Sequence, residues 1–382
     1  MNTTIAQAVE EGNLYEIEDM VNAALAAGEH PKELLEAMMA GLKACGDRFE
    51  KGEYFLRFAA CFGQYLIAHD AKISYKNLPV RLYELTHYSF RREQSGELAG
   101  LRRLRIFTMP DMHTLCGDVP QAKHEMLNQV GLSYQWMADL GFDYVVALRA
   151  VKDFYEKDPA YAFEIARRAN RPVLLEVWDR RYFYFVTKFE ANVVDTQAKA
   201  AALSTVQIDV ENPQGFGITY TAQDGTEQYP LMLHTSVSGS IDRNLYALLE
   251  QQAGKMARGE KANFPFWLAP TQIRLIPVKE AHFEHCERLA ARLPGRVDID
   301  DRNETLGKRI RSAEKDWVPY AIAVGDREAE AEKLPVRVRG EAQPREMSVG
   351  DIEAEFTRQM VGKAFRGLNV PRRLSLRPIF RG

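Results

Sequence analysis

The segment from Arg81 to Cys116 constrains this chain most, because it predicts a β-hairpin with a chemically specialised face. Two stretches of strand-forming residues flank a polar loop that contains glycine. On the returning strand every second residue lies on the same side of the sheet. The residues on that side are Arg103, Arg105, Phe107, Met109, Asp111 and His113. Such a face is not a hydrophobic core, and we expect it to bind a polyanion, stack a base and hold a cationic or metal-bound group.

The outgoing strand carries Arg91 and Glu93, which are two residues apart and therefore share a face. Pro110 interrupts the returning strand and predicts an edge or a bulge there. A charged hairpin that only faces solvent is the alternative for an isolated arginine pair. The hairpin nevertheless resembles motif 2 of class II aminoacyl-tRNA synthetases, and the run FRRE…GLRRLRIFTMPDMH resembles the threonyl-tRNA synthetase family in particular.

Composition limits what the rest of the chain can be. At 382 residues the chain is long enough for two or three domains with full cores. The net charge of −3 gives no global basic field, although residues 356–382 contain seven Arg or Lys and no Asp or Glu. This basic end is either an RNA-facing patch or a solvated end.

The four cysteines lie far apart without a CxxC motif, so we expect a protein of the reducing cytoplasm. No apolar run reaches about 18 residues, so we expect no membrane span.

The sequence predicts an α+β fold built from three segments. Residues 1–53 have helical apolar spacing and resemble the N-terminal helical half of corrinoid (methyltransferase-type) proteins, most specifically in GDRFEKGEYFL. Residues 54–262 are strand-rich and predict an antiparallel sheet, which the resemblance implies to be the catalytic core of a class II synthetase. Residues 263–382 alternate strands and helices, which predicts a small α/β domain resembling the anticodon-binding domain of these enzymes. We expect its last helix over residues 351–366.

A second motif, LMLHTSVSGSIDRNLYALLEQ, resembles motif 3 of the same family. It predicts a strand, a Gly-Ser turn and a helix with Arg243 in the first helical turn. Because a helix N-terminus favours anions and arginine can fork onto phosphate oxygens, Arg243 is a candidate for the γ-phosphate contact. The alternative for an isolated residue of this kind is an ordinary exposed helix arginine.

The segment AACFG around Cys61 provides a third point of resemblance. In the family a cysteine here binds zinc together with the histidines that end motif 2 and open motif 3, which implies Cys61, His113 and His234. Three protein ligands leave one coordination position open. The resemblance implies that threonine offers its amino and hydroxyl groups to this zinc and that valine, which has no hydroxyl, is rejected. It also implies that Asp111 holds the substrate ammonium and that Tyr184 lines the pocket.

The resemblance implies an ATP site as well. Gln207, with Thr205 beside it, would face ATP and the adenylate, Arg91 would bind the α-phosphate and Arg103 would assist. Phe107 would stack on adenine, and Glu93 would contact the adenine amino group or position the loop. Arg91 and Arg243 would be the catalytic residues, with Mg²⁺, for attack of the threonine carboxylate on the α-phosphorus. Transfer of the threonyl group to tRNA(Thr) would follow.

In residues 263–382 four polar side chains occupy positions where the family reads anticodon bases. These are Asn303, Arg311, Glu328 and Arg337. Unpaired bases are read by edge hydrogen bonds and stacking, which suits polar side chains. Each of the four, taken alone, fits an ordinary surface group equally well.

The resemblance starts at FLRFAACFG, and no motif 1 or editing domain is recognised before it. A homodimer and full activity, both expected for the family, therefore come into question. One alternative is a non-catalytic tRNA-binding relative of the synthetases. Another is a corrinoid-binding protein, since DMHTLC from Asp111 begins like a DxHxxG loop but has Cys116 in the place of the glycine.

Overall fold

The computed structural model describes residues 2–11, 14–50, 61–89 and 99–378. Arg91 and Glu93 lie outside the described residues. The chain divides into two compact units, Met1–Ala59 and Ala60–Gly382. Within the described ranges no helix combines the length and the apolar character needed to cross a membrane.

The first unit is helical, as the sequence predicts. It consists of α1 (Thr3–Glu11), α2 (Leu14–Ala26) and α3 (Pro31–Glu50). Ile5, Ala24, Leu34 and Ala37 form its small buried core. Helices α1 and α3 approach closely at Gly41, where an added Cβ would lie 2.2 Å from the backbone oxygen of Ala6.

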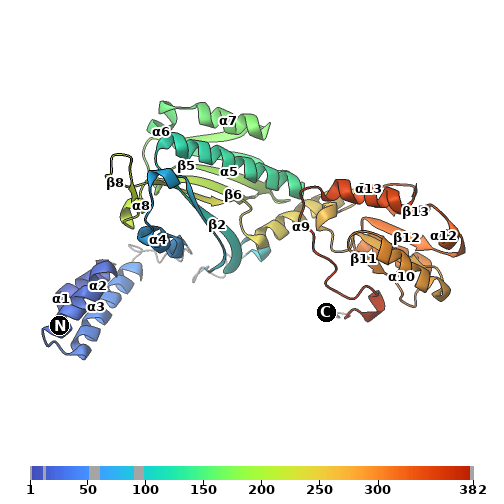
Figure 1. The fold of residues 1–382 in the computed structure, drawn as a ribbon, viewed down its shortest axis with the longest axis horizontal. Coiled ribbons are helices and arrows are strands. Elements are labelled where there is room, and N and C mark those ends of the chain that lie inside the picture. The colour runs from blue at the N-terminus through green and yellow to red at the C-terminus, as the bar shows by residue number, and fades with distance from the viewer. Residues whose placement is uncertain (1, 12–13, 51–60, 90–98, 379–382) are drawn as a thin grey trace. The chain divides into compact units, whose positions relative to one another are not determined.

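The second unit is dominated by a seven-stranded sheet in the order β1-β2-β9-β6-β5-β3-β4 (Figure 1). The strands are β1 (Val80–Ser89), β2 (Ile106–Cys116), β3 (Val145–Val151), β4 (Val173–Trp178), β5 (Phe185–Val194), β6 (Ala200–Asp209) and β9 (Leu231–Ser236). All neighbouring strands are antiparallel except β3 and β4. The predicted antiparallel core is therefore confirmed.

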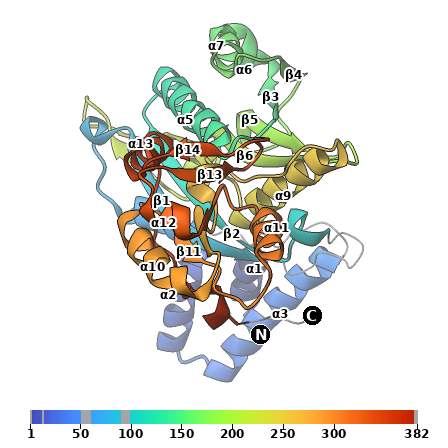
Figure 2. The ribbon, with the colours of Figure 1, turned by 90° about the vertical axis from the view of Figure 1, so that its right-hand side faces the viewer.

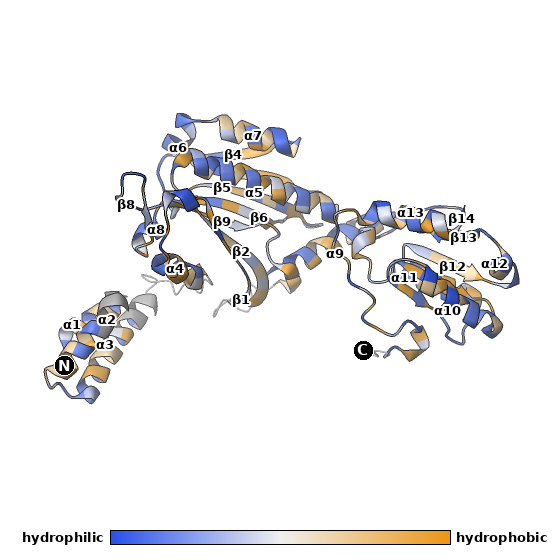
Figure 3. Cartoon of the chain, viewed as in Figure 1, coloured by the Kyte–Doolittle hydropathy of each residue, from blue (hydrophilic) through white to orange (hydrophobic). Residues whose placement is uncertain are grey.

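Different helices cover the two faces of this sheet. On one face α5 (Val119–Leu140) and α7 (Ala160–Ala169) bury residues such as Met126 and Ile165 against Leu148, Phe189 and Leu233 of the strands. Hydrophobic and hydrophilic residues both occur along these helices (Figure 3), as expected when one face is buried. On the other face α4 (Cys61–Asp70) packs Tyr65 and Ala68 into a separate core with Leu115 and Met232. The candidate site residues lie on this second face.

The predicted hairpin is formed by β1 and β2, but the strand starts later than predicted, and of the predicted edge or bulge at Pro110 only the edge is found. Strand β2 begins at Ile106, so Arg103 and Arg105 precede it. The β1–β2 register runs without a shift through Leu85 and Pro110, so there is no bulge. Strand β9 pairs with β2 only from Met112 onward, and Pro110 lies beyond the end of that ladder, where no N–H donor is needed.

Shorter elements complete this part of the chain. They are η1 (Tyr75–Asn77), η2 (Gly100–Arg102), α6 (Lys152–Lys157), α8 (Asn212–Gly215), β7 (Tyr220–Thr221), β8 (Glu227–Gln228), α9 (Ile241–Ala257) and η3 (Phe266–Leu268). Helix α9 follows β9 after a turn at Gly239 and is capped by Ser240, whose Oγ accepts from the Arg243 backbone N–H at 3.1 Å. The strand, turn and helix predicted for the second motif are thus present.

The C-terminal part is a small domain around a five-stranded sheet, β11-β10-β12-β13-β14, seen in Figure 2. Its strands are β10 (Ile273–Pro277), β11 (Val297–Ile299), β12 (Tyr320–Val324), β13 (Leu334–Val338) and β14 (Arg345–Met347). Its helices are η4 (Glu280–His282), α10 (Phe283–Arg292), α11 (Leu306–Lys315), α12 (Asp326–Glu330), α13 (Val349–Met360) and η5 (Leu374–Leu376). Helices α10 and α13 contribute to one core of the domain and α11 to another.

The small domain confirms the predicted α/β class. The last helix is shorter than predicted, because it ends at Met360 and Gly362 adopts a left-handed conformation with φ of +69°. The remaining chain then runs along β11, where the Ile299 N–H donates to Arg372 O at 2.9 Å.

Candidate functional site

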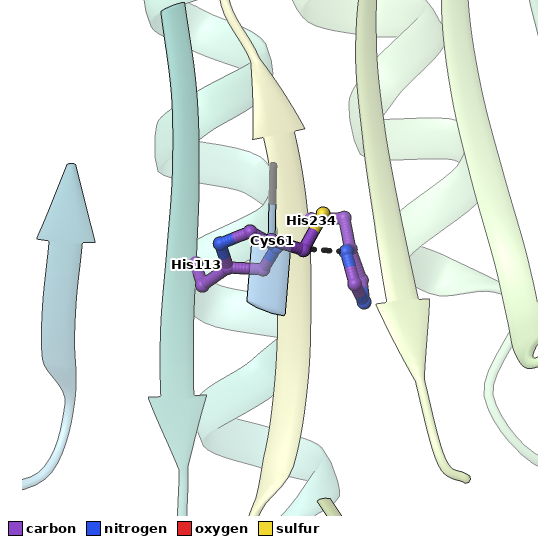
Figure 4. Close-up of side chains that lie close together, drawn as sticks. All are labelled: Cys61, His113 and His234. Carbon is purple, nitrogen blue, oxygen red and sulfur yellow. Dashed lines mark hydrogen bonds between the residues drawn. The ribbon is translucent and has the colours of Figure 1, made fainter. Parts of the chain in front are cut away.

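The register of β2 and β9 places two histidines side by side. His113 and His234 are directly opposite each other in the ladder, so both side chains lie on the face covered by α4. Cys61, the first residue of α4, lies beside them. The Sγ and ring-nitrogen atoms of these three residues all lie within 4.8 Å of one another, and Figure 4 shows them converging. The three side chains named from the sequence are therefore brought together.

Hydrogen bonds orient both imidazoles. Gln64 donates its amide N–H to Asp111 O at 3.5 Å, so its Oε1 faces His113 Nδ1 at 2.8 Å and accepts from it. His234 Nε2 donates to the Asp209 carboxylate at 2.7 Å. His113 Nε2 and His234 Nδ1 lie 3.0 Å apart and share a hydrogen bond, drawn as a dashed line in Figure 4. A bound cation would replace the shared proton and accept a lone pair from each ring.

The electrostatics of the three groups suit a metal ion. Burial, and then the neighbouring His234, lower the pKa of His113 to about 4, which keeps its ring neutral and its lone pair free. Burial raises the pKa of the Cys61 thiol to about 12, and Asp111 adds to the rise. A bound cation would reverse this effect and stabilise the thiolate. Cysteine and histidine donors with an open fourth direction fit a borderline-soft divalent metal.

Asp209 is a functional residue that the sequence reasoning missed. Burial opposes its ionisation, but hydrogen bonds from His234 and from the backbone N–H groups of Glu211 and Asn212 outweigh burial, and the pKa of Asp209 is lowered. A carboxylate that fixes the tautomer of a ligating histidine raises the basicity of that ligand. The signal available in the sequence was its spacing, because Asp209 lies two residues after Gln207 on one strand.

We expect Asp209→Asn to lower metal affinity about 10- to 100-fold, because the amide can still accept a hydrogen bond but carries no charge. Metal affinity would be measured by competition with a chromogenic chelator. Asp224→Asn is the matched control, since among the described residues the Asp224 side chain bonds to Thr226 in a surface turn. Equal affinities for the two variants would show that Asp209 has no role in metal binding.

Asp111, Tyr184 and Gln207 lie around this metal-binding group. Asp111 is buried, and its Oδ2 accepts from the Tyr88 hydroxyl at 2.7 Å and lies 3.5 Å from Cys61 Sγ. The Tyr184 hydroxyl donates to Gln207 Oε1 at 2.7 Å. Gln207 is the cross-strand partner of His234, and the Tyr184 and His234 rings are 5.0 Å apart. A carboxylate, an amide and a phenol thus surround the open side of the metal-binding group.

A cavity of about 440 Å³ lies between the end of the hairpin and the start of α9. Arg103, Phe107, Thr205 and Arg243, all named from the sequence, line it. Phe107 stacks on Tyr88 with ring centroids 5.7 Å apart and planes inclined by 9°. With Arg102, which also lines it, the cavity offers an aromatic ring and three arginines, a combination that suits a nucleotide.

Arg243 is fixed by backbone oxygens. It donates to Arg102 O at 3.1 Å and to Ala202 O at 2.8 Å. Burial, with Arg102 and Arg103 close by, lowers the pKa of its guanidinium. A buried cation beside other cations is stabilised by an anion, which supports phosphate as the ligand here.

Asp195 holds the end of the hairpin loop in place and was not anticipated from the sequence. Its Oδ2 accepts from Arg102 at 3.1 Å and from the Tyr246 hydroxyl at 3.0 Å, and its Oδ1 accepts from the backbone N–H of Lys199 at 2.8 Å. The Arg102 carbonyl in turn accepts from Arg243, so the Asp195 carboxylate positions Arg102 directly and Arg243 through it. Nothing in the local sequence distinguishes Asp195 from a turn residue.

The four small-domain residues are not gathered into one pocket. Asn303 lines a cavity of about 770 Å³ at the ends of β10 and β11. Arg311 and Arg337 border two adjacent hollows that share Lys261 and Arg339. Glu328 accepts from the Gly325 N–H at 2.9 Å and caps α12. A ligand that touches all four must be extended, as a nucleic-acid strand is.

Models of three protein families match successive parts of the chain. A model described as tRNA synthetase class II core domain (G, H, P, S and T) matches residues 44–252. A model described as anticodon binding domain matches residues 272–359, and one described as B12 binding domain matches residues 1–59. The first match starts at residue 44, ahead of the predicted boundary at 54, and overlaps the B12 match.

Relatives of known name are similar over most of the chain. A threonine–tRNA ligase of Thermococcus gammatolerans is 52% identical over 336 residues, which cover 86% of this chain and 54% of that protein. One of Nitrosopumilus maritimus is 46% identical over 98% of this chain and 61% of its own length, so the similarity includes most of the N-terminal helices. This chain spans about half the length of the curated relatives it matches.

Solved structures show the same fold at low identity. A threonyl-tRNA synthetase RNA binding domain from Cryptosporidium parvum superposes with a TM-score of 0.66 at 23% identity, covering 82% of this chain and 77% of that one. A putative threonyl-tRNA synthetase from Aeropyrum pernix gives a TM-score of 0.61 at 20% identity, covering 82% and 75%. At these identities the comparison concerns the fold alone.

Proposed function

This chain belongs to the class II tRNA synthetase family, and we propose that it activates threonine with ATP and transfers the threonyl group to tRNA(Thr). The observation that carries the proposal is the placement of Cys61, His113 and His234 next to Asp111 and beside the nucleotide-sized cavity. Relatives named threonine–tRNA ligases at about half identity support the choice of amino acid. The proposed catalytic part is residues 54–262, and the proposed RNA-reading part is residues 263–382.

We propose zinc as the metal. Cys61, His113 and His234 would hold the ion, which would supply a Lewis-acidic position for the amino and hydroxyl groups of threonine. Asp111 would pair with the substrate ammonium, and Tyr184 and Gln207 would close the pocket. A site that requires a hydroxyl rejects a substrate lacking it by roughly 10⁴-fold, whereas an apolar pocket separates valine from threonine by only about 10²-fold.

ATP would occupy the cavity between the hairpin and α9. Phe107 supplies a ring for adenine, and Arg103 and Arg243 supply positive charge for phosphate oxygens and for the Mg²⁺-bound nucleotide. The carboxylate of threonine would attack the α-phosphorus and release pyrophosphate. Catalysis in this scheme comes from positioning and charge stabilisation, with no protein nucleophile. Arg91 and Glu93 remain predicted contributors, and both lie outside the described residues.

Asp195→Asn is expected to raise the KM for ATP about tenfold and to leave the KM for threonine unchanged. The variant keeps the size of the side chain but weakens the charged hydrogen bond to Arg102, so the cavity wall loses its anchor. Steady-state pyrophosphate exchange at varied ATP and at varied threonine would separate the two constants. Asp224→Asn again provides the control, and an equal change in both constants would point to a general loss of structure.

The small domain would read the anticodon loop through Asn303, Arg311, Glu328 and Arg337. Their spread over several hollows suits unpaired bases bound one at a time. We place the activity in the cytoplasm and, from the family, expect a homodimer. Sedimentation velocity of the whole chain would test the dimer directly.

The deciding experiment is threonine-dependent ATP–pyrophosphate exchange on the full chain with zinc and Mg²⁺. Exchange with threonine but not with valine supports the proposal. A folded, zinc-loaded chain without exchange that still binds tRNA would instead establish the alternative of a non-catalytic tRNA-binding relative. The corrinoid alternative loses its motif, because Asp111, His113 and Cys116 belong to β2 of the core sheet.

A further inference from the structure

The loop between β4 and β5 exposes an unusual concentration of aromatic and basic side chains. The sequence Trp178–Phe185 reads WDRRYFYF. Tyr182 and Phe183 are 58% and 53% exposed, although exposure of large aromatic rings is unfavourable unless something covers them. Trp178 lies between them, 5.9 Å from Tyr182 and 5.6 Å from Phe183 by ring centroids. We call Trp178, Tyr182 and Phe183 the aromatic platform.

The aromatic platform is continuous with the candidate active site. Phe183 stacks on Phe185 at 5.2 Å with planes 6° apart, and Phe185 contacts Tyr184 at 5.4 Å. Tyr184 reaches His234 and Gln207. A line of rings therefore leads from the edge of the sheet to the pocket proposed for the amino acid.

Strand pairing puts this line on the same face as the site. Gln207, Lys188, Arg149 and Glu176 are successive cross-strand partners from β6 to β4. The Trp178 indole N–H donates to Glu176 Oε1 at 2.7 Å, which ties the platform to the outer end of that row. The platform and the metal-binding group thus share the face that α5 and α7 leave uncovered.

The charge of the loop favours a negatively charged ligand. The Arg180 guanidinium lies 5.0 Å from the centre of the Tyr182 ring. Arg181 pairs with Glu211 at 2.6 Å and also donates to the Phe183 carbonyl at 3.1 Å, so it fixes the backbone of the loop. Asp179 is the one acidic residue within the loop itself. Exposed rings beside an arginine are the combination that binds unpaired nucleotides.

We propose that the aromatic platform, with Arg180, receives the unpaired 3′ end of the RNA that accepts the threonyl group. The inference rests on the proposed function, because the second step requires a terminal ribose to reach the adenylate. Bases next to that ribose would stack on Tyr182 and Phe183, and Arg180 would face the phosphates. Stacking is tolerant of base identity, so the platform would position the end without reading its sequence.

The test uses the full chain and a 5′-labelled single-stranded RNA that ends in CCA, followed by fluorescence anisotropy at fixed salt. The double variant Tyr182→Ala/Phe183→Ala should weaken binding at least about tenfold. Pyrophosphate exchange, which needs no RNA, should stay within about twofold of the parent chain. Arg180→Gln should lower the slope of log Kd against log salt by about 0.7.

Two further variants separate stacking from structural damage. Tyr182→Phe keeps the ring and should bind RNA like the parent chain. Phe163→Ala removes a ring that is 68% exposed on α7, away from the platform, and should change nothing. A general folding defect in the double variant would lower pyrophosphate exchange as well as RNA binding, so unchanged exchange together with these controls would exclude it.

Several results would overturn the proposal. One is no RNA binding by the parent chain. Another is unchanged RNA binding by the double variant, either alone or together with a change in the oligomeric state of that variant in sedimentation. Such a change would identify a protein interface, since neighbouring Leu174 and Val177 on β4 are also exposed. RNA binding is measured without turnover. If the chain showed no exchange, the proposed activity would be disproved, but the RNA affinities of the parent chain and the double variant could still be compared.

Discussion

His113→Gln will leave the chain folded but remove metal binding, and threonine-dependent pyrophosphate exchange will fall by at least about 100-fold. Loss of a residue that only supports a metal ligand costs about 10- to 100-fold, and His113 is itself a proposed ligand. It is fully buried and lies 3.0 Å from His234, so no other described side chain takes its place. Glutamine retains most of the volume, which limits collapse of the pocket.

Metal content would be measured by atomic emission after dialysis, and exchange by isotope incorporation. His124→Gln is the matched control, because His124 is exposed on α5, across the sheet from the site. Treating the parent chain with a chelator should reproduce the His113→Gln result, and adding zinc back should restore exchange in the parent alone. Full exchange by a metal-free variant would disprove the role of the ion in substrate selection.

Gly239→Ala is expected to lower the free energy of unfolding by about 3 kcal/mol, because two costs act together. Gly239 has φ of +68°, a conformation that alanine resists. Its added Cβ would also lie 2.0 Å from the Leu203 carbonyl oxygen, so backbone must shift. Ala202, the preceding residue, accepts from Arg243, and we therefore expect a higher KM for ATP as well.

Gly225→Ala provides the comparison that isolates the steric cost. Gly225 has φ of +83°, but no atom lies within 4 Å of an added Cβ. The Gly225→Ala variant should lose about 1 kcal/mol of unfolding free energy, which is the conformational cost alone, and its KM for ATP should not change. Urea unfolding followed by tryptophan fluorescence would measure both variants. Equal losses in the two would mean that the turn before α9 can relax.

The elements of the fold were predictable where short-range pattern decides them. The period-two stripe on β2 and the strand–turn–helix that leads to Arg243 follow from residue spacing alone. The end of α13 at Met360 was missed, because the apolar pattern continues past the residue where the backbone turns at Gly362. The sequence left an edge and a bulge open at Pro110, since the length of the β9 ladder, which decides for the edge, is a tertiary property.

The charged and ligand-type residues of the candidate site could be predicted from the sequence. The residues that hold them in position could not. Cys61, His113 and His234 were named from the resemblance to the family, because residues of ligand type stand at all three expected places. Asp195 and Asp209 act through partners brought from elsewhere in the chain, Arg102 and His234 respectively. The spacing of Asp209 from Gln207 indicates a shared strand face, but only the folded sheet reveals which partners the two carboxylates bind.

The exact pairing of β2 with β9 has a consequence for how accuracy is encoded. A slip of one residue between two strands turns every side chain of the slipped strand to the opposite face. A slip of β9 by one residue would move His234 to the side of α5 and put Leu233 or Thr235, which cannot replace it as a ligand of this type, opposite His113. Under the proposed function, such a slip would separate the two histidine ligands and abolish the selection of threonine over valine without any change in the residues present. The proposed selectivity would therefore depend on the alignment of two backbones as much as on the identity of the ligands.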